Sequence, residues 1–238
     1  MATPSGSDLP RFAGFPAGTF TFLKGVKQYN EKIWFNAHHE SYTECYVKPG
    51  LQLVEALGPK LRKLSKGLVV DSRAKGGNLL PIFLGPEETK RFYKTYLDLW
   101  FWEDKKDVSE IGFYYKMNDR RVALYAGVQT FGKREQEAFR AAVLDDKQGE
   151  ALVAAMDAVE KASRKYRVMG YQEHLRKLKG YDKKHPRIEL MRYTQLYCGF
   201  EMPSPKLVRT AELVAWCMEH FTAFEPLTRW LRANVTGK

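Results

Sequence analysis

Residues 111–131 read IGFYYKMNDRRVALYAGVQTF, and this stretch decides the fold class. Apolar side chains recur at every second position within 111–117 and again within 122–128. Such alternation is typical of strands that bury one face. Asn118 and Asp119, which lie between the two runs, are residues that tight turns favour. The stretch is therefore predicted to form an antiparallel hairpin.

The segments on either side of this hairpin predict a fold of the α+β class. Strand composition recurs near 68–70 and 96–102, whereas apolar residues spaced three and four positions apart dominate both flanks. Because runs of strands are set between runs of helices, we expect a small, mainly antiparallel sheet packed against N-terminal and C-terminal helices. The predicted helices are 19–28, 31–47, 51–63, 133–144, 150–165, 187–197 and 205–234.

Individual residues suggest where these elements begin and end. Asn30 is a suitable N-cap for the second helix, and Pro49-Gly50 is expected to separate it from the third. Residues 168–186, rich in Gly, Lys and His, are interpreted as a connection. Residues 1–10 are short, polar and rich in Ser, Gly and Pro, so they are predicted to be a flexible N-terminus ahead of a single α+β domain, 11–238.

Composition and charge narrow the classes of function. Hydrophobic residues make up 44% of the chain, enough for a continuous core. A formal net charge of +11 favours an anionic partner, either a phosphate-bearing ligand or nucleic acid, although a merely solvated basic face is the plain alternative. The N-terminus lacks the pattern of a secretory signal, and no apolar run is long enough to span a membrane, so no membrane partner is expected.

The three cysteines, Cys45, Cys198 and Cys217, are far apart and form no C-x-x-C motif. They are interpreted as small buried hydrophobes in a cytoplasmic protein. No Walker sequence, dinucleotide fingerprint or nucleophile elbow occurs, and no cofactor or metal is expected. The pair His38-His39 is likewise assigned to packing, because adjacent helical side chains diverge by about 100° and cannot readily share one metal ion.

Two segments carry a more specific pattern. The opening has F-x-G-F-P at residues 12–16, followed by Asn30 and by the pair Trp34-Phe35. Residues 180–186 read GYDKKHP. In both segments the chain resembles the widespread bacterial family known as domain of unknown function 2461. The resemblance implies one α+β fold over nearly the whole chain and assigns no reaction.

The centre of the chain departs from that family. The family's stretch has the form R-x-x-R-D-x-R-F-x-x-x-K-x-x-Y-K, whereas residues 82–95 here read IFLGPEETKRFYKT. Lys90, Tyr93, Lys94 and Thr95 fall on matching positions, but apolar residues or Gly replace the Arg and Asp positions. The chain is interpreted as a divergent member with a changed or lost activity, and the resemblance predicts fold better than function.

The basic and aromatic residues of this centre form the first candidate site. Guanidinium and ammonium groups can hold phosphate oxygens, and a tyrosine ring can stack or donate its hydroxyl. The alternative is a solvated basic loop. The predicted ligand-binding residues are Arg73, Lys75, Lys90, Arg91, Tyr93 and Lys94, with Tyr181 from the later segment.

The second candidate is the polar trio Tyr181, Asp182 and His185. His185 could act as general acid or base near neutral pH, with Asp182 selecting its tautomer. A structural role is the stronger interpretation: the pair would tie down the loop that enters a helix at Arg187, where Pro186 suits the first turn.

These residues lead to three hypotheses of function. The leading one is a basic protein that binds a phosphate-bearing ligand or nucleic acid. The second is an enzyme acting on a small anionic substrate, with His185 as acid or base. The third is a non-catalytic interaction protein using Trp100 and Trp102, although alternation along their strand favours burial of these rings. Whether the protein is an enzyme, and its oligomeric state, stay open.

Overall fold

The helices at the start of the chain form where apolar residues recur at helical spacing. The computed structural model describes residues 9–84, 92–174 and 178–237. In α1 (Ala17–Gln28) the buried residues are Thr19, Phe22, Leu23 and Val26, which lie on one face. The following helices are α2 (Lys32–Ala37), α3 (His39–Tyr42), a π-helical turn (Thr43–Val47) and α4 (Lys48–Leu61).

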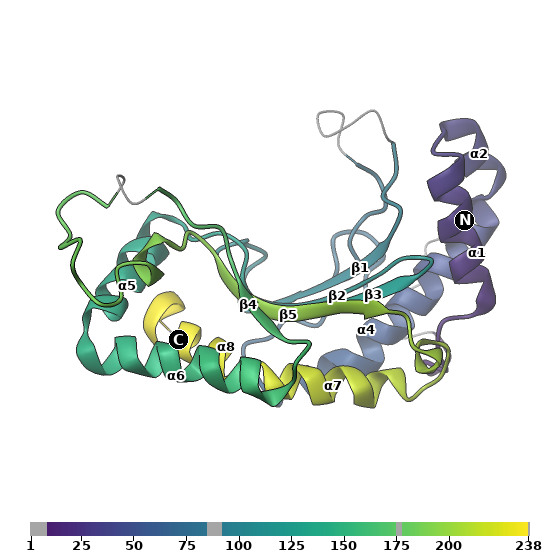
Figure 1. Cartoon of the computed structure of the whole chain (residues 1–238). Coiled ribbons are helices and arrows are strands. Elements are labelled where there is room, and N and C mark those ends of the chain that lie inside the picture. Colours follow the sequence, from purple (N-terminus) through teal and green to yellow (C-terminus); the bar gives the residue numbers. More distant parts are fainter. Residues whose placement is uncertain (1–8, 85–91, 175–177, 238) are drawn as a thin grey trace. The chain divides into compact units, whose positions relative to one another are not determined.

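The hairpin predicted for 111–131 is present and forms the middle of the sheet. Its strands are β2 (Ile111–Met117) and β3 (Arg121–Val128), and the side-chain oxygen of Asn118 accepts hydrogen bonds from the backbone N–H groups of Arg120 and Arg121, both at 2.8 Å. The strands are ordered β1-β2-β3-β5-β4, and β4 is antiparallel to β5 (Figure 1). The edge strands are β1 (Leu97–Trp102) and β4 (Arg167–Met169), and β5 (Leu196–Pro203) lies between β3 and β4. The fold is therefore of the α+β class.

The later helices complete the element order. They are α5 (Lys133–Leu144), α6 (Asp146–Ala162), α7 (Leu213–Ala223) and α8 (Glu225–Leu231), with short turns of 3-10 helix at Leu190–Arg192 and Lys206–Arg209 and of π-helix at Arg232–Thr236. Within the described residues, no helix combines the length and apolar character needed to cross a bilayer.

The chain divides into two compact units. The first comprises the described parts of 1–101, 114–124 and 201–220, and the second those of 102–113, 125–200 and 221–238. Strands β1, β2, β3 and β5 each contribute residues to both units. The single domain expected over 11–238 stays a prediction.

In the first unit, the F-x-G-F-P segment lies against the 3-10 helix at Lys206–Arg209. The backbone N–H of Phe15 donates to the carbonyl of Val208 at 3.1 Å, and the Phe15 ring, 1% exposed, stacks on Tyr115 at 6.0 Å. Gly14 has φ +111°, and a Cβ there would lie 2.1 Å from the carbonyl carbon of Arg209. Only glycine suits both this dihedral angle and this close approach of two backbones.

In the second unit, α6 packs against both α5 and α8 (Figure 1). The N-cap Asp145 accepts from the backbone N–H of Gln148 at 2.8 Å, and the indole N–H of Trp230 donates to the Gln148 carbonyl at 2.9 Å. The carboxylate of Glu103, 2% exposed, is held by the guanidinium of Arg232 at 2.6 Å from Oε1 and 3.2 Å from Oε2. This pair fixes the last helical turn to the segment ahead of β2.

Three expectations about the elements were wrong. Residues 68–70 form no strand of the sheet. Backbone groups of this segment bond to a side chain instead: the Asn78 amide donates to the Val69 carbonyl and accepts from the Asp71 N–H. Asn30 does not cap α2, whose N-cap is Glu31. Pro49 does not separate two helices, because it lies in the first turn of α4, where its missing N–H costs no intrahelical hydrogen bond.

The helix predicted for 187–197 was also wrong, and most of that segment is irregular. Only Leu190–Arg192 is helical, as a single 3-10 turn, and β5 begins at Leu196. Burial of alternate residues Leu196, Cys198 and Phe200 follows the strand period. The partner strand β4 lies in the segment interpreted as a connection.

Candidate anion-binding pocket

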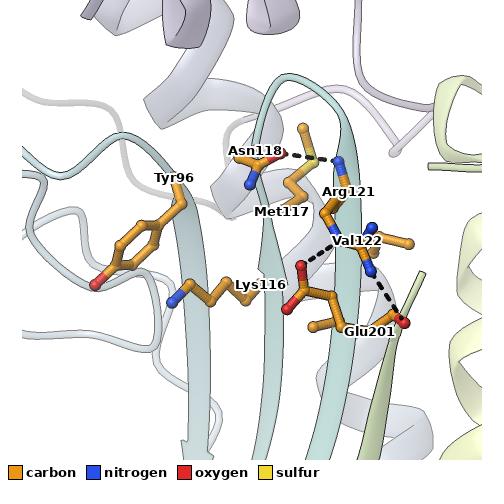
Figure 2. A pocket seen from close by; sticks show the side chains of 8 residues that line it. Tyr96, Lys116, Met117, Asn118, Arg121, Val122 and Glu201 are labelled. Carbon is orange, nitrogen blue, oxygen red and sulfur yellow. Dashed lines mark hydrogen bonds and ion pairs between the residues drawn. The ribbon is translucent and has the colours of Figure 1, made fainter. Parts of the chain in front are cut away.

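The candidate site is a pocket in the first unit, beside the hairpin turn. Its volume is about 160 Å³. Figure 2 shows Lys116 on β2 directed toward the ring of Tyr96, and Arg121 on β3 next to Glu201 of β5. The pocket is lined by Tyr96, Lys116, Met117, Asn118, Arg121, Val122, Ala123 and Glu201.

Each cation in the pocket has a defined position. The Lys116 ammonium lies 3.7 Å from the centroid of the Tyr96 ring, close enough for a cation–π interaction. The Arg121 guanidinium forms an ion pair with the Glu201 carboxylate, and its Nη2 lies 3.5 Å from the Glu201 carbonyl oxygen. Both Arg121 and Glu201 keep nearly half of their side-chain surface exposed, so a solute can reach them.

An ion pair lies behind Tyr96. The ammonium of Lys94 is 3.2 Å from the carboxylate of Asp98, and both side chains are mostly buried. The same ammonium lies 5.6 Å from the Tyr96 ring centroid. Burial raises the pKa of the Asp98 carboxyl above its ordinary value, and the positive charges of Lys94 and then Lys116 lower it in part.

The charges of this region do not cancel. Among the described residues named here, Lys94, Lys116 and Arg121 face the carboxylates of Asp98 and Glu201. Three cations and two carboxylates leave one positive charge when Asp98 is ionised, and two when it is protonated. An anion entering the pocket would therefore meet net positive charge next to Lys116.

The predicted basic cluster is only partly assembled. Lys90 and Arg91 lie outside the described residues. Arg73 is exposed and forms an ion pair with Asp71 at 2.5 Å, and Lys75 is exposed in the same loop. Lys94 does not line the pocket, but its ammonium contacts the ring of Tyr96, which does.

Tyr93 points to the core rather than to solvent. Its ring is 4% exposed and stacks on Phe35, with centroids 4.2 Å apart and planes 7° from parallel. Burial raises the pKa of its hydroxyl. The ring available to solvent in this segment belongs to Phe92, which is 47% exposed.

The second candidate site lies in the second unit and makes structural contacts. The Asp182 carboxylate accepts from the Lys184 N–H at 2.9 Å, while Nδ1 of His185 accepts from the Arg187 N–H at 3.1 Å. The neutral form of His185 in this arrangement carries its proton on Nε2. The ring of Tyr181 lies 6.0 Å from the guanidinium of Arg140.

Arg187 explains why that loop is anchored. Its Nε donates to the carbonyl of Val143 at 2.9 Å, in the last turn of α5, and its Nη2 pairs with Asp146 at 2.8 Å. The ion pair with Arg187 lowers the pKa of Asp146. Asp182 and His185 thus order the loop that positions Arg187, and Arg187 caps the C-terminal end of α5. A catalytic role for Asp182 and His185 stays a prediction.

Other sequence interpretations are settled by burial. His38 stacks on Trp34 at 4.0 Å, which confirms packing for this histidine, whereas His39 is exposed. Trp100 and Trp102 are 7% and 4% exposed, so these rings belong to the core. Cys198 and Cys217 are fully buried, and burial raises the pKa of both thiols, whereas Cys45 is only partly buried.

Lys116 and Arg121 were missed by reasoning from the sequence. Both flank the hairpin turn, where charged residues are ordinary solvent-facing residues. Their significance depends on Tyr96 and Glu201, which lie far away in the sequence. Only a weak indication of this site exists in the sequence: Lys116 interrupts the otherwise apolar end of β2, close to Arg120 and Arg121 at the turn.

Two comparisons with known proteins bear on this chain. A family model described as "Conserved hypothetical protein (DUF2461)" matches residues 18–82 and 84–230. A search of the curated proteins gave no match.

Proposed function

The chain belongs to the conserved hypothetical family DUF2461, and from its pocket we propose that it binds a small anionic group of the size of phosphate. The observation that carries the proposal is that Lys116 and Arg121 line one cavity. Among side chains, lysine and arginine hold phosphate and carboxylate oxygens most strongly, because their ammonium and guanidinium groups donate charge-assisted hydrogen bonds.

The size of the pocket limits the ligand. About 160 Å³ is well below the roughly 300–1,000 Å³ of pockets that enclose drug-sized molecules. It suits a phosphate or carboxylate group, either as a free ion or as the end of a larger molecule that extends into solvent. Tyr96 and Asn118 also line the wall of the pocket.

The net charge of the chain supports the same ligand class. At +11, the protein attracts anions at long range, and this attraction weakens as salt is added. Buried, high-pKa thiols at Cys198 and Cys217 are compatible with a reducing compartment, and we propose the cytoplasm as the location.

The proposal is tested by titrating inorganic phosphate and pyrophosphate into the protein by isothermal titration calorimetry. We expect binding at about 50 mM salt that weakens at about 200 mM, as screening of exposed charges requires. Lys116→Gln should weaken binding about tenfold or more, since a hydrogen bond to a charged group contributes about 1.5–3 kcal/mol. The matched control is Lys66→Gln, which removes an exposed lysine of the same unit.

Two results would contradict the proposal. One is the absence of heat for either anion at the lower salt concentration. The other is equal affinity of Lys116→Gln and Lys66→Gln, which would mean that general charge, rather than the pocket, attracts the anion.

A further inference from the structure

A second feature of the first unit is a group of exposed aromatic side chains, here termed the aromatic patch: Tyr29, Phe83 and Phe92. Their exposed fractions are 48%, 55% and 47%. Phe83 and Phe92 lie on two neighbouring segments, joined by an antiparallel bridge between Phe83 and Tyr93 and by a hydrogen bond from the Leu84 N–H to the Phe92 carbonyl at 3.0 Å. Large side chains with this exposure need a partner more often than isolated surface residues do.

The rings of the aromatic patch rest on a buried aromatic layer. Phe83 lies 5.4 Å from the rings of both Phe35 and Tyr93, and Phe92 lies 6.4 Å from Tyr93. Tyr29 stacks on Trp34 at 6.1 Å and 22°. Each exposed ring is thus supported from within while part of its surface faces solvent.

The backbone that carries Phe92 is fixed by Asn30. The side-chain oxygen of Asn30 accepts from the N–H groups of Phe92 and Tyr93, at 2.8 and 3.0 Å. Its amide nitrogen donates to the carbonyls of Tyr93 and Val26, at 2.9 and 3.2 Å. The backbone at Phe92 and Tyr93 is therefore held against the end of α1 by hydrogen bonds of one side chain.

Positive charge borders the aromatic patch. The Lys32 ammonium lies 5.2 Å from the centroid of the Phe92 ring, and Lys27 is exposed in the last turn of α1. Glu31 is an exposed acid between these two lysines in the sequence, so the described residues 27–32 carry two cations and one carboxylate. A partner that fits must offer flat rings to the aromatic side chains and negative charge to the lysines.

We propose that the aromatic patch binds single-stranded nucleic acid. Bases stack on Phe83 and Phe92, and Lys32 contacts an adjacent phosphate. Exposed aromatic rings on neighbouring extended segments, bordered by cations, are the arrangement with which proteins hold unpaired bases. A duplex is excluded because its bases are stacked on one another and present no free face. The inference uses none of the residues of the anion pocket and stands or falls separately from it.

The test uses fluorescence anisotropy with the full chain and labelled single strands of oligo-dT and oligo-U, at about 50 and 200 mM salt. We expect binding that weakens steeply with salt, and binding to a duplex of equal length that is at least tenfold weaker. The double variant Phe83→Ala/Phe92→Ala should lose tenfold or more in affinity for the single strand. Tyr171→Ala, which removes a ring that is 63% exposed in the other unit, is the matched control and should bind as the wild type does.

Further measurements separate stacking from charge and from misfolding. Lys32→Gln, a surface change that removes no apolar contact from the core, should reduce the slope of log affinity against log salt concentration by about one. Lys66→Gln, which removes an exposed lysine of the same unit, should leave both the affinity and this slope unchanged. An oligomer with the sugar–phosphate backbone but no bases should bind at least tenfold more weakly than oligo-dT. Circular dichroism and thermal melting establish that the variants are folded.

Several outcomes would overturn the proposal. They are no binding of either single strand at about 50 mM salt, undiminished binding by the folded Phe83→Ala/Phe92→Ala variant, and equal binding of the base-free oligomer. Binding to anionic phospholipid vesicles without binding to single strands would assign the aromatic patch to a lipid surface instead.

Discussion

Replacement of Gly14 by alanine should destabilise the first unit strongly, for two separable reasons. An L-residue held at φ +111° carries backbone strain of about 1–3 kcal/mol. In addition, the new Cβ would lie 2.1 Å from the carbonyl carbon and 2.4 Å from the carbonyl oxygen of Arg209. Both of these atoms belong to the backbone, so no side-chain rotation relieves the clash.

The magnitude of the second effect follows from the hydrogen bond that the clash breaks. Separating the two backbones removes the 3.1 Å bond from the Phe15 N–H to the Val208 carbonyl, which contributes about 0.5–1.5 kcal/mol. Strain and the broken bond together give a decrease of roughly 1.5–4.5 kcal/mol in the free energy of unfolding. Partial exposure of the Phe15 ring would add to this value.

The control is Gly76→Ala. Gly76 has φ +84° but no atom within 4 Å of a Cβ, so it reports strain without the clash. Urea unfolding followed by circular dichroism and tryptophan fluorescence measures both variants, with the m-value as the check that the same transition is compared. The close approach of the Gly14 and Arg209 backbones would be refuted as a cause in two cases. One is an equal decrease in unfolding free energy for both substitutions, and the other is a decrease below about 1 kcal/mol for Gly14→Ala.

Two further predictions concern ion pairs. Burial raises the folded-state pKa of Asp98 above its unfolded value, so its contribution to stability is fully present below the unfolded pKa and is lost as pH rises through the folded pKa. Urea titrations at several pH values should therefore show that the unfolding free energy of Asp98→Asn falls less steeply above about pH 4 than that of the wild type. An equal slope for the two proteins would contradict this prediction. Arg187→Ala should lower the unfolding free energy by about 1–3 kcal/mol, because the carbonyl of Val143 and the carboxylate of Asp146 lose their donor. Arg187→Lys keeps the charge but not the planar set of donors, so it should be destabilised by only part of that amount. Wild-type stability of Arg187→Lys would show that charge alone matters.

Local pattern was enough to predict the elements whose partners are close in sequence. The hairpin β2–β3 has its turn within three residues, and α5 was predicted with the bounds it has, Lys133–Leu144. In contrast, β5 lies between β3 and β4, and β4 ends more than two dozen residues earlier in the sequence. Long-range pairing of this kind leaves little trace in a short window of sequence.

The sites followed the same division. The motif resemblance pointed to the Phe12–Phe15 and Gly180–Pro186 segments, and the structure gives both of them anchoring hydrogen bonds. The pocket and the aromatic patch arise instead where distant segments meet: Glu201 reaches Arg121, and Asn30 reaches Phe92. A charged residue on a strand, or an exposed ring beside a loop, has no special pattern before the chain is folded.

The interleaving of the two units has a consequence for how the chain folds as it is synthesised. Each unit is assembled from three separate stretches, so the first stays incomplete until residue 220 has emerged from the ribosome. The second needs Arg232, whose partner Glu103 was made 129 residues earlier. Domains formed from one contiguous stretch can fold in order during translation; here neither unit can be completed in that way. Slow, long-range pairing of strands, rather than helix formation, should therefore limit the folding rate.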